Sequence, residues 1–236
     1  MKISAPIYYK DFKCIADRCR HSCCVGWEIC IDGDTLSRYG EAKGGYAEKI
    51  KSTVREIDGE YSFMLSEGER CPHLDERGLC RIIKSLGEGW LCEICREHPR
   101  FYNYVGDCLE VGLGASCEEA ARIILSSPDY RSYLAVGEAE GEAAEATLGK
   151  VERERVFSFL RDTSRPYAER LEIISRKWRV NPEVLSVEMW REALSQLEYL
   201  DERDRELFLT YRSNPSRSGI AEPCERFLAY LIYRHL

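Results

Sequence analysis

The second half of the chain carries the period of an α-helix. Apolar residues recur there at spacings of three and four, which places them on one face of a helix. The segments with this pattern are 154–162, 167–178, 181–200, 204–212 and 225–236. Asn181 and Pro182 form a favourable pair for a helix start, as N-cap and first helical residue. The last segment runs to the final residue without a cap, so we expect a shortened form of a longer protein.

The first half is less regular and predicts short elements. Residues 1–13 are apolar and aromatic with one proline, and we expect them to be extended or briefly helical and to pack against the cysteine-bearing segments that follow. A helix is predicted over 46–57, because Ile50, Val54 and Ile57 share one helical face. Other expected elements are a helix near 35–42, a strand at 61–67, a strand or loop over 101–117, and a helix over 118–127.

Together these patterns predict a mainly α protein with three regions. Residues 1–136 are expected to form an irregular, cysteine-rich, cluster-binding region with short β pieces. Residues 137–149 are small and acidic, which is typical of a linker or a loop. Residues 150–236 are expected to form a helical bundle.

Composition narrows the class of protein. No apolar run approaches the ~18 residues of a membrane span, and the first residues lack the apolar segment of a secretion signal. We therefore expect a cytoplasmic protein with no membrane partner, whose thiols stay reduced. A net charge of −7 and scattered Lys and Arg residues give no basic patch for nucleic acid. The twelve cysteines are then better explained as ligands or catalysts than as disulfides.

Eight of the twelve cysteines fall in two groups. The first group holds Cys14, Cys19, Cys23 and Cys24, and the second holds Cys71, Cys80, Cys92 and Cys95. We expect the two groups to fold onto one another around metal, with the rest of the chain framing the site.

Local patterns predict how individual sulfurs are placed. The turn DERG would bring Cys71 close to Cys80, and a helix would put Cys92 and Cys95 on one face. Cys117 directly precedes a predicted helix. A helix N-terminus lowers the pKa of a thiol, which favours metal ligation there.

The kind of metal follows from the ligands. Soft thiolates select zinc or an iron–sulfur cluster. Four thiolates hold Zn²⁺ in a closed structural site, yet the repeated CxxC spacing of such sites is absent, as are common ferredoxin and radical S-adenosylmethionine spacings. Cys92 and Cys95 form a CxxC without the βαβ context of a thioredoxin-type redox pair. An iron–sulfur cluster is preferred, and zinc remains the alternative.

Other residue types are weaker candidates. His73 and His98 lie inside the second cysteine group, whereas His21 and His235 fit surface or capping roles better. Arg100 would neutralise thiolate charge or fix the turn, or it would be an ordinary surface residue. The sequence presents no Ser-His-Asp or paired-carboxylate constellation.

Three stretches resemble one family, the flagellin lysine-N-methylases: CIADRCRHSCCVGWEICID, CPHLDERGLCRIIKSLGEGWLCEICREHPRFY and SCEEAARIIL. That family is related to cysteine-cluster domains described as zinc- or iron-chelating. The resemblance covers residues 1 to about 127 and continues loosely through the helical half. It implies a cysteine-bound cluster, [4Fe-4S] by preference, and methyl transfer from S-adenosylmethionine to lysine side chains of flagellin. The matching positions are Cys14, Cys19, Cys23, Cys24, Cys71, Cys80, Cys95 and Cys117, with Cys92 as a ninth.

The resemblance leaves several alternatives open. Cys30, Cys108 and Cys224 fall outside the family pattern, and Cys30 is expected to be a buried structural thiol. Eight or nine matching thiols exceed the four that one cluster needs, so there are two sites or some thiols are structural. No motif of the chain would by itself hold S-adenosylmethionine. The alternatives to a methylase are a non-catalytic zinc- or iron-chelating module and a redox or electron-transfer protein.

Overall fold

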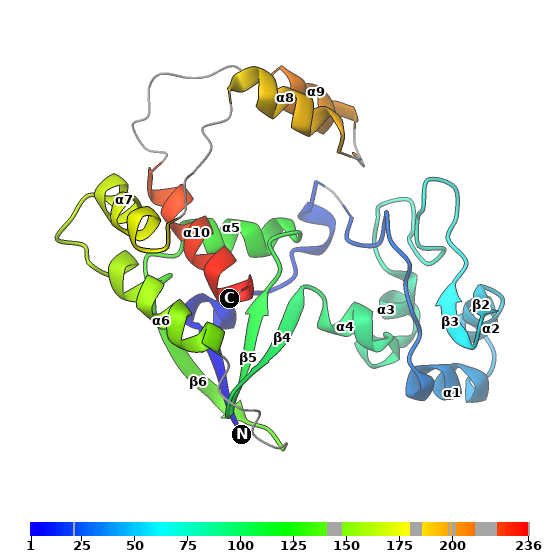
Figure 1. Ribbon diagram of the computed structural model, residues 1–236. Helices are drawn as coiled ribbons and strands as arrows, with labels where there is room; N and C mark the ends of the chain where they lie inside the picture. The colour runs from blue at the N-terminus through cyan, green and yellow to red at the C-terminus, as the bar shows by residue number, and fades with distance from the viewer. Residues whose placement is uncertain are drawn as a thin grey trace.

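The computed structural model describes residues 1–20, 22–140, 148–179, 186–197, 199, 202–210 and 221–235. Two regions lie side by side in it (Figure 1). The α/β body comprises residues 1–12, 99–140, 148–179 and 221–235, and the cysteine-rich lobe comprises residues 22–98. A connecting loop, residues 13–20, contains the short 3₁₀ turn η2 (Ala16–Arg18).

A sheet with the strand order β4-β5-β1-β6 forms the centre of the body. Its strands are β1 (Lys2–Pro6), β4 (Arg100–Val105), β5 (Cys108–Leu113) and β6 (Tyr133–Glu138). β1 is parallel to β5 and antiparallel to β6, and β4 and β5 form a hairpin. The alternating apolar residues within 101–117 are therefore confirmed as strands. The fold is mixed α/β rather than mainly α, because the N-terminal segment and three later segments pair in this sheet.

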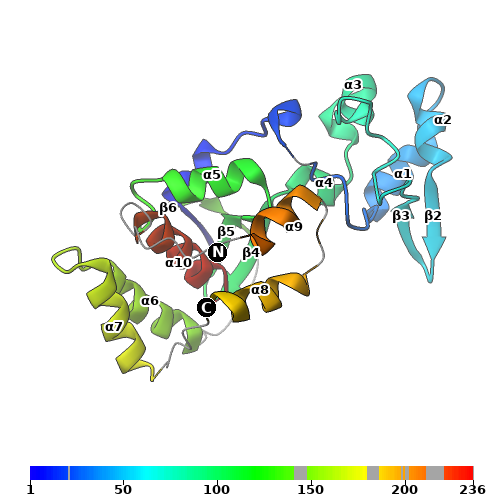
Figure 2. The same cartoon turned by 90° about the horizontal axis from the view of Figure 1, so that it is seen from above.

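Helices pack together beside this sheet, as Figures 1 and 2 show from two directions. They are α5 (Glu118–Ser126), α6 (Leu148–Leu160), α7 (Tyr167–Lys177) and α10 (Ala221–His235). Their apolar faces bury Phe157, Leu160 and Tyr233. Tyr8, in the 3₁₀ helix η1 (Ile7–Asp11), joins the same core. The expected packing of the N-terminal aromatic residues on the cysteine region is thus wrong, because strand β1 carries them into the body.

Ion pairs inside the body are shielded from water. Arg153 of α6 binds both carboxylate oxygens of Glu110 on β5, and the two side chains are 4% and 6% exposed. Arg170 of α7 binds both oxygens of Glu225 on α10, at 2.6 and 2.8 Å. Charges buried to this degree must be paired, so each bond fixes one helix against its neighbour.

Helices α8 (Val187–Ser195) and α9 (Glu202–Leu209) pack against one another. The helical periodicity of these segments is confirmed. Ser186 caps α8, since its hydroxyl accepts from the Met189 N–H at 3.2 Å, whereas the predicted cap at Asn181 and Pro182 lies outside the described residues. Among the helices of the described ranges, none is both long and apolar enough to cross a membrane.

Short elements build the lobe. They are α1 (Gly33–Glu41), α2 (Tyr46–Lys51), β2 (Val54–Ile57), β3 (Glu60–Phe63), α3 (Arg81–Leu86), η3 (Glu88–Trp90) and α4 (Glu93–Glu97). The helix predicted over 46–57 is wrong in its second half, where β2 pairs with β3. Asp58 and Gly59 have φ values of 52° and 85°, and such left-handed pairs close two-residue hairpins. The hairpin turn therefore overrides the helical spacing.

Candidate metal centre

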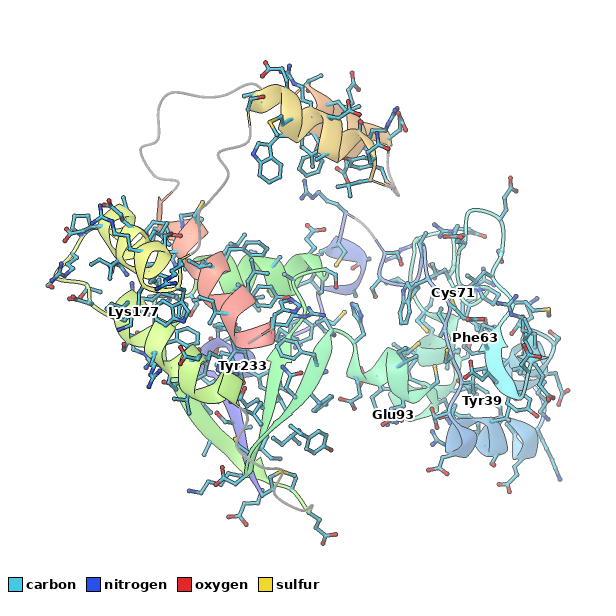
Figure 3. All side chains as sticks on the ribbon, viewed as in Figure 1. Tyr39, Phe63, Cys71, Glu93, Lys177 and Tyr233 are labelled. Atoms are coloured by element: carbon cyan, nitrogen blue, oxygen red, sulfur yellow. The ribbon has the colours of Figure 1, made fainter. Side chains whose placement is uncertain are left out.

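Five of the candidate thiols belong to the core of the lobe. Cys71 and Cys92 are buried there beside Phe63, and Figure 3 shows Cys71 and Phe63 in this region. Cys24, Cys80 and Cys95 pack at the edge of the same core and are half-buried. We call the five the buried thiol set: Cys24, Cys71, Cys80, Cys92 and Cys95.

A turn and two hydrogen bonds from backbone N–H groups position Cys24, Cys71 and Cys80. The Cys71 N–H donates to the Cys24 carbonyl at 2.9 Å. The Asp75 carboxylate accepts from the Leu79 N–H at 2.9 Å and so closes the predicted turn, after which Leu74 and Cys80 form a bridge. The turn is confirmed, and it returns the chain from Cys71 to Cys80 as the sequence indicated.

Helix α4 positions the other pair. Cys92 is its N-cap residue and Cys95 lies in its first turn, so their sulfurs are 3.4 Å apart. The hydrogen bond between them lowers the pKa of Cys92 and raises the pKa of Cys95, because one thiolate is stabilised by the other thiol. The Asp32 carboxylate accepts from the Glu93 N–H at 2.7 Å and anchors α4 to the start of α1. The expected shared orientation of Cys92 and Cys95 is confirmed.

Burial favours the neutral form of the Cys71 and Cys80 thiols. It raises the pKa of Cys71 to about 11 and also raises the pKa of Cys80. The backbone N–H of His73 opposes this effect at Cys71, and those of Ile83 and Ile82 oppose it at Cys80, because they stabilise a thiolate. A bound metal cation would favour the thiolate form of these cysteines over the neutral thiol, since metal ligation requires thiolates.

The four other candidate thiols come from three parts of the chain: Cys14 and Cys19 from the connecting loop, Cys23 from the first residues of the lobe, and Cys117 from the body. Cys14 and Cys23 are exposed, and Cys19 and Cys117 are half-buried. We call Cys14, Cys19, Cys23 and Cys117 the open thiol set. Burial raises the pKa of Cys19 to about 11, helped first by the negative charge of Cys117 and then of Glu118.

A charged clasp links the segment that carries Cys19 to the segment that carries Cys117. The backbone N–H of Arg20 donates to the Glu118 carboxylate at 2.8 Å, and the Arg20 guanidinium donates to it at 3.3 Å. Cys117 is the N-cap of α5, as predicted, and burial raises its pKa while the N–H groups of Ala120 and Glu119 oppose the rise. The predicted net lowering of the Cys117 pKa by the helix N-terminus is therefore wrong, since burial outweighs it.

The histidines of the second cysteine group have different environments. Thr53 donates its hydroxyl to the Ile50 carbonyl at 2.7 Å, so it accepts from Nε2–H of His73 at 3.0 Å. Nδ1 of His73 then accepts from the Tyr46 hydroxyl at 3.0 Å. Both ring nitrogens are occupied, so His73 is a buried packing residue and not a ligand.

His98, Arg100 and Cys30 have surroundings that differ from those of the buried thiol set. Nε2 of His98 is buried with no hydrogen-bond partner among the described residues, and its ring lies over Trp27. The Arg100 guanidinium donates to the Tyr9 hydroxyl at 3.1 Å and lies over the Phe12 ring, both within the body. It also donates to the Arg96 carbonyl of the lobe at 3.5 Å. Cys30 is exposed, so its expected burial is wrong. His21 lies outside the described residues.

The described side chains do not form a ready mononuclear site. Among them, no three His, Cys, Asp or Glu residues are arranged to hold one metal ion. Ligands of an iron–sulfur cluster need not meet at one point, because each sulfur binds a different iron. The donor chemistry of both sets, thiolate sulfur with backbone N–H groups near it, fits zinc or an iron–sulfur cluster.

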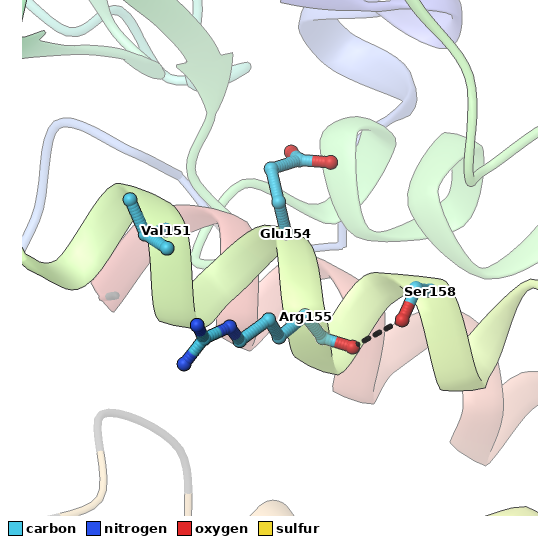
Figure 4. A pocket seen from close by; sticks show the side chains of 4 residues that line it. All are labelled: Val151, Glu154, Arg155 and Ser158. Atoms are coloured by element: carbon cyan, nitrogen blue, oxygen red, sulfur yellow. Dashed lines mark hydrogen bonds between the residues drawn. The ribbon is translucent and has the colours of Figure 1, made fainter.

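The sequence did not indicate a shallow pocket on the outer side of α6 (Figure 4). Val151, Glu154, Arg155 and Ser158 line it, and its volume is about 500 Å³. Ser158 donates its hydroxyl to the Arg155 carbonyl at 2.7 Å, so its oxygen serves the helix. The lining includes no cysteine or histidine, and the pocket therefore adds nothing to the metal chemistry.

The chain is similar in sequence to known proteins of Salmonella. Lysine-N-methylases of Salmonella typhimurium and Salmonella choleraesuis are 30% and 29% identical to this chain over 140 residues, which is 54% of this chain. The flagellar biosynthetic protein FliU of Salmonella muenchen is 30% identical over 149 residues, which is 58% of this chain and 82% of that protein. No family model matches the chain, and no solved structure matches it.

The extent of the matches differs between these relatives. The matched segment covers 33% of the length of each lysine-N-methylase. It covers most of FliU. The chain therefore spans only about a third of the length of the two lysine-N-methylases.

Proposed function

Because this chain belongs to the flagellin lysine-N-methylase-like family, we propose that it methylates protein lysine side chains with the help of a thiolate-bound iron–sulfur cluster. Flagellin is the proposed protein substrate, and S-adenosylmethionine is the proposed methyl donor. The names of the Salmonella relatives support the reaction and the flagellar connection.

The observation that carries the proposal is the gathering of thiols from distant segments. The clasp between Arg20 and Glu118 brings the first cysteine group to Cys117. The backbone bond from Cys71 to Cys24 brings the second group to the first. A fold that assembles so many soft ligands, in a family with methylase members, supports a metal-dependent methylase.

The proposed reaction is balanced without a further reactant. A neutral lysine Nζ attacks the methyl carbon of the sulfonium, so an N–C bond forms while the C–S bond breaks. The electron pair of the C–S bond leaves with the sulfur as S-adenosylhomocysteine, and the surplus proton of the product amine passes to water. Since a free lysine has a pKa of about 10.4, the site must bind its neutral form. A bound cluster supplies Lewis-acidic or redox-active iron.

The test is methyl transfer by the anaerobically purified chain. Methyl-labelled S-adenosylmethionine and flagellin are incubated with the chain, and label on lysine is measured by mass spectrometry. Label on flagellin lysines, together with iron and acid-labile sulfide in the protein, is expected. A chain that holds zinc without iron or sulfide would contradict the cluster, and a metal-loaded chain that leaves every lysine unlabelled would contradict the enzyme.

A second candidate is a non-catalytic metal-binding module. The observation that favours it is the match to only a third of each lysine-N-methylase. If this candidate holds, the chain binds its metal fully and transfers no methyl group. A chimera that carries the unmatched part of a relative would then restore transfer.

A further inference from the structure

Strand β4 is an edge strand of the body sheet, since β5 is its only strand neighbour among the described residues. Figure 1 shows it at the margin of the sheet, on the side of the lobe. Natural edge strands are usually protected against further pairing by charged side chains, a proline or a β-bulge. After Arg100, β4 holds no charged residue and no proline, and it pairs with β5 without a bulge. This edge is therefore open to another strand.

The hydrogen bonds between β4 and β5 determine which backbone groups face the open edge. The Pro99 carbonyl accepts from the Gly114 N–H at 2.6 Å, just before the first residue of β4. Hydrogen-bonded residues alternate along an antiparallel strand, so every second residue after Pro99, up to Val105, bonds to β5. The N–H and C=O groups of Tyr102 and Tyr104 therefore point away from β5, toward the edge.

The side chains of the same two tyrosines share one face of the sheet and are exposed. Tyr102 is 45% exposed and Tyr104 is 67% exposed. Phe101 and Asn103 project to the opposite face, where the Arg234 guanidinium lies over the Phe101 ring and the Arg234 carbonyl accepts from the Asn103 amide at 3.2 Å. The edge thus presents backbone hydrogen-bonding groups and aromatic side chains at the same two positions.

This arrangement is complementary to itself. A second copy of β4, antiparallel and related by a two-fold axis at Asn103, has its Tyr104 opposite Tyr102 of the first copy, and the reverse. Each of these two pairs exchanges both backbone hydrogen bonds, and aromatic side chains directly opposite one another stabilise paired strands. The same register brings the exposed Asp107 of one copy opposite Pro99 of the other, one residue from the Arg100 cation. Opposite charges therefore meet at both ends of the strand pair.

We propose that two copies of this chain associate through β4, which joins their sheets into one continuous sheet across a two-fold axis. Two-fold interfaces, in which both copies use the same surface, are the commonest in soluble homo-oligomers. The contact consists of one strand pair with the side chains beside it, so it is small and the dimer should dissociate on dilution. The proposal is independent of metal binding and of methyl transfer, because β4 carries no cysteine.

The first test is sedimentation of the full chain over a range of concentrations, under reducing conditions that prevent disulfides between copies. Wild type is expected to pass from monomer to dimer as its concentration rises. Residue-resolved hydrogen exchange should then show slower exchange of the Tyr102 and Tyr104 amides in the dimer. The amides of Phe101 and Asn103 already bond to β5, so their exchange should not depend on the concentration of the chain.

Two double variants provide a matched pair for the second test. Tyr102→Lys with Tyr104→Lys puts like charges opposite one another in both cross-strand pairs, whereas Tyr102→Lys with Tyr104→Glu puts unlike charges there. Both variants change only exposed side chains and keep every backbone N–H. The dimer dissociation constant is expected to be at least about tenfold higher for the first variant than for the second.

Three results would overturn the proposal. One is a wild-type chain that stays monomeric at every concentration. Another is a dimer with the same dissociation constant in the two double variants, which would place the contact on a different surface. The third is a monomeric chain whose Tyr102 and Tyr104 amides become protected only when flagellin is added, because the edge would then bind a strand of another protein.

Discussion

The body and the lobe are stabilised in different ways. The body buries large side chains such as Phe157 and Tyr233 between helices of up to 15 residues, and it closes its charged groups into pairs. The lobe has helices of 5 to 9 residues, and thiols occupy part of its core. Helices so short are marginal without tertiary support. We therefore expect apolar burial to be sufficient for the stability of the body, and we expect the lobe to need metal bound to its thiols.

Metal removal is expected to give the largest difference in stability between the lobe and the body. Chelation under reducing conditions is expected to speed amide exchange in α1 and β3 by about a hundredfold or more, because metal binding supplies much of the folding free energy of a thiolate-framed unit. Exchange in α6 and α10 should change little. Hydrogen exchange with mass spectrometry measures both, and equal loss of protection in the two regions would refute the contrast.

A cavity in the body should have the reverse effect. Phe157 is fully buried, and Phe157→Ala is expected to lower the free energy of unfolding by about 3–5 kcal/mol. Metal bound by the buried thiol set should be unchanged, because the lobe core is separate from that of Phe157. Phe208→Ala on α9 is the control, since Phe208 is 45% exposed and should cost far less. Chemical denaturation reports the free energies, and a loss of metal in Phe157→Ala would show that the regions are not independent.

The Glu225 carboxylate provides a smaller, pH-dependent test of the body. Burial alone would raise its pKa, but hydrogen bonds from Arg170, Tyr130 and Arg131 lower the pKa of Glu225. The stability that these bonds supply is therefore complete above the unfolded pKa of about 4.3 and is lost as the pH falls through the lower folded value.

Breaking a buried ion pair lowers the free energy of unfolding by about 3–5 kcal/mol. Glu225→Gln should lower it by less, because the amide oxygen still accepts one hydrogen bond. The difference in unfolding free energy between wild type and variant should shrink below about pH 4.3. Denaturation curves across pH 3 to 7 measure it. A difference that stays constant throughout this range would show that the carboxylate charge contributes nothing.

A single hydrogen bond in the lobe should matter less again. Tyr46→Phe leaves Nδ1 of His73 without its donor, at a cost of about 1–3 kcal/mol. Metal content is expected to stay at the wild-type level, since His73 is not a ligand. Tyr61→Phe, on the neighbouring strand β3, is the control. Depleted metal in Tyr46→Phe alone would return His73 to the list of ligand candidates.

The smallest effect is expected at Cys30. Its side chain is exposed and lies outside both thiol sets, so Cys30→Ala should change the free energy of unfolding by less than about 0.5 kcal/mol. Metal analysis and denaturation together check this. A loss of bound metal would mean that Cys30 belongs with the candidate ligands.

Local patterns in the sequence were sufficient where the structure depends on local forces. The DERG turn, the Cys92–Cys95 pair and the helix after Cys117 follow from turn residues, spacing and capping, which act within a few positions. Spacing misled at 54–57, because Asp58 and Gly59 favour a hairpin more strongly than three apolar residues favour a helix. The Asp-Gly signal was available in the sequence.

Long-range pairings could not be predicted in this way. No local pattern indicates that β1 lies between β5 and β6, since such pairings depend on the whole sheet. The division of thiols between two cores has the same origin, because Arg20 and Glu118 are far apart in the chain. The exposure of Cys30 also depends on packing around it, for which its sequence neighbours carry no signal.

The pairing of Lys2 with Cys108 has a consequence for synthesis of the protein. β1 is synthesised before its partner strands, which follow only about a hundred residues later, so the pairing has a high contact order. At about 5–20 residues per second, β1 waits for roughly 5–20 s without a partner. The lobe is made during that interval. The length of that interval sets how long an unpaired strand remains open to aggregation.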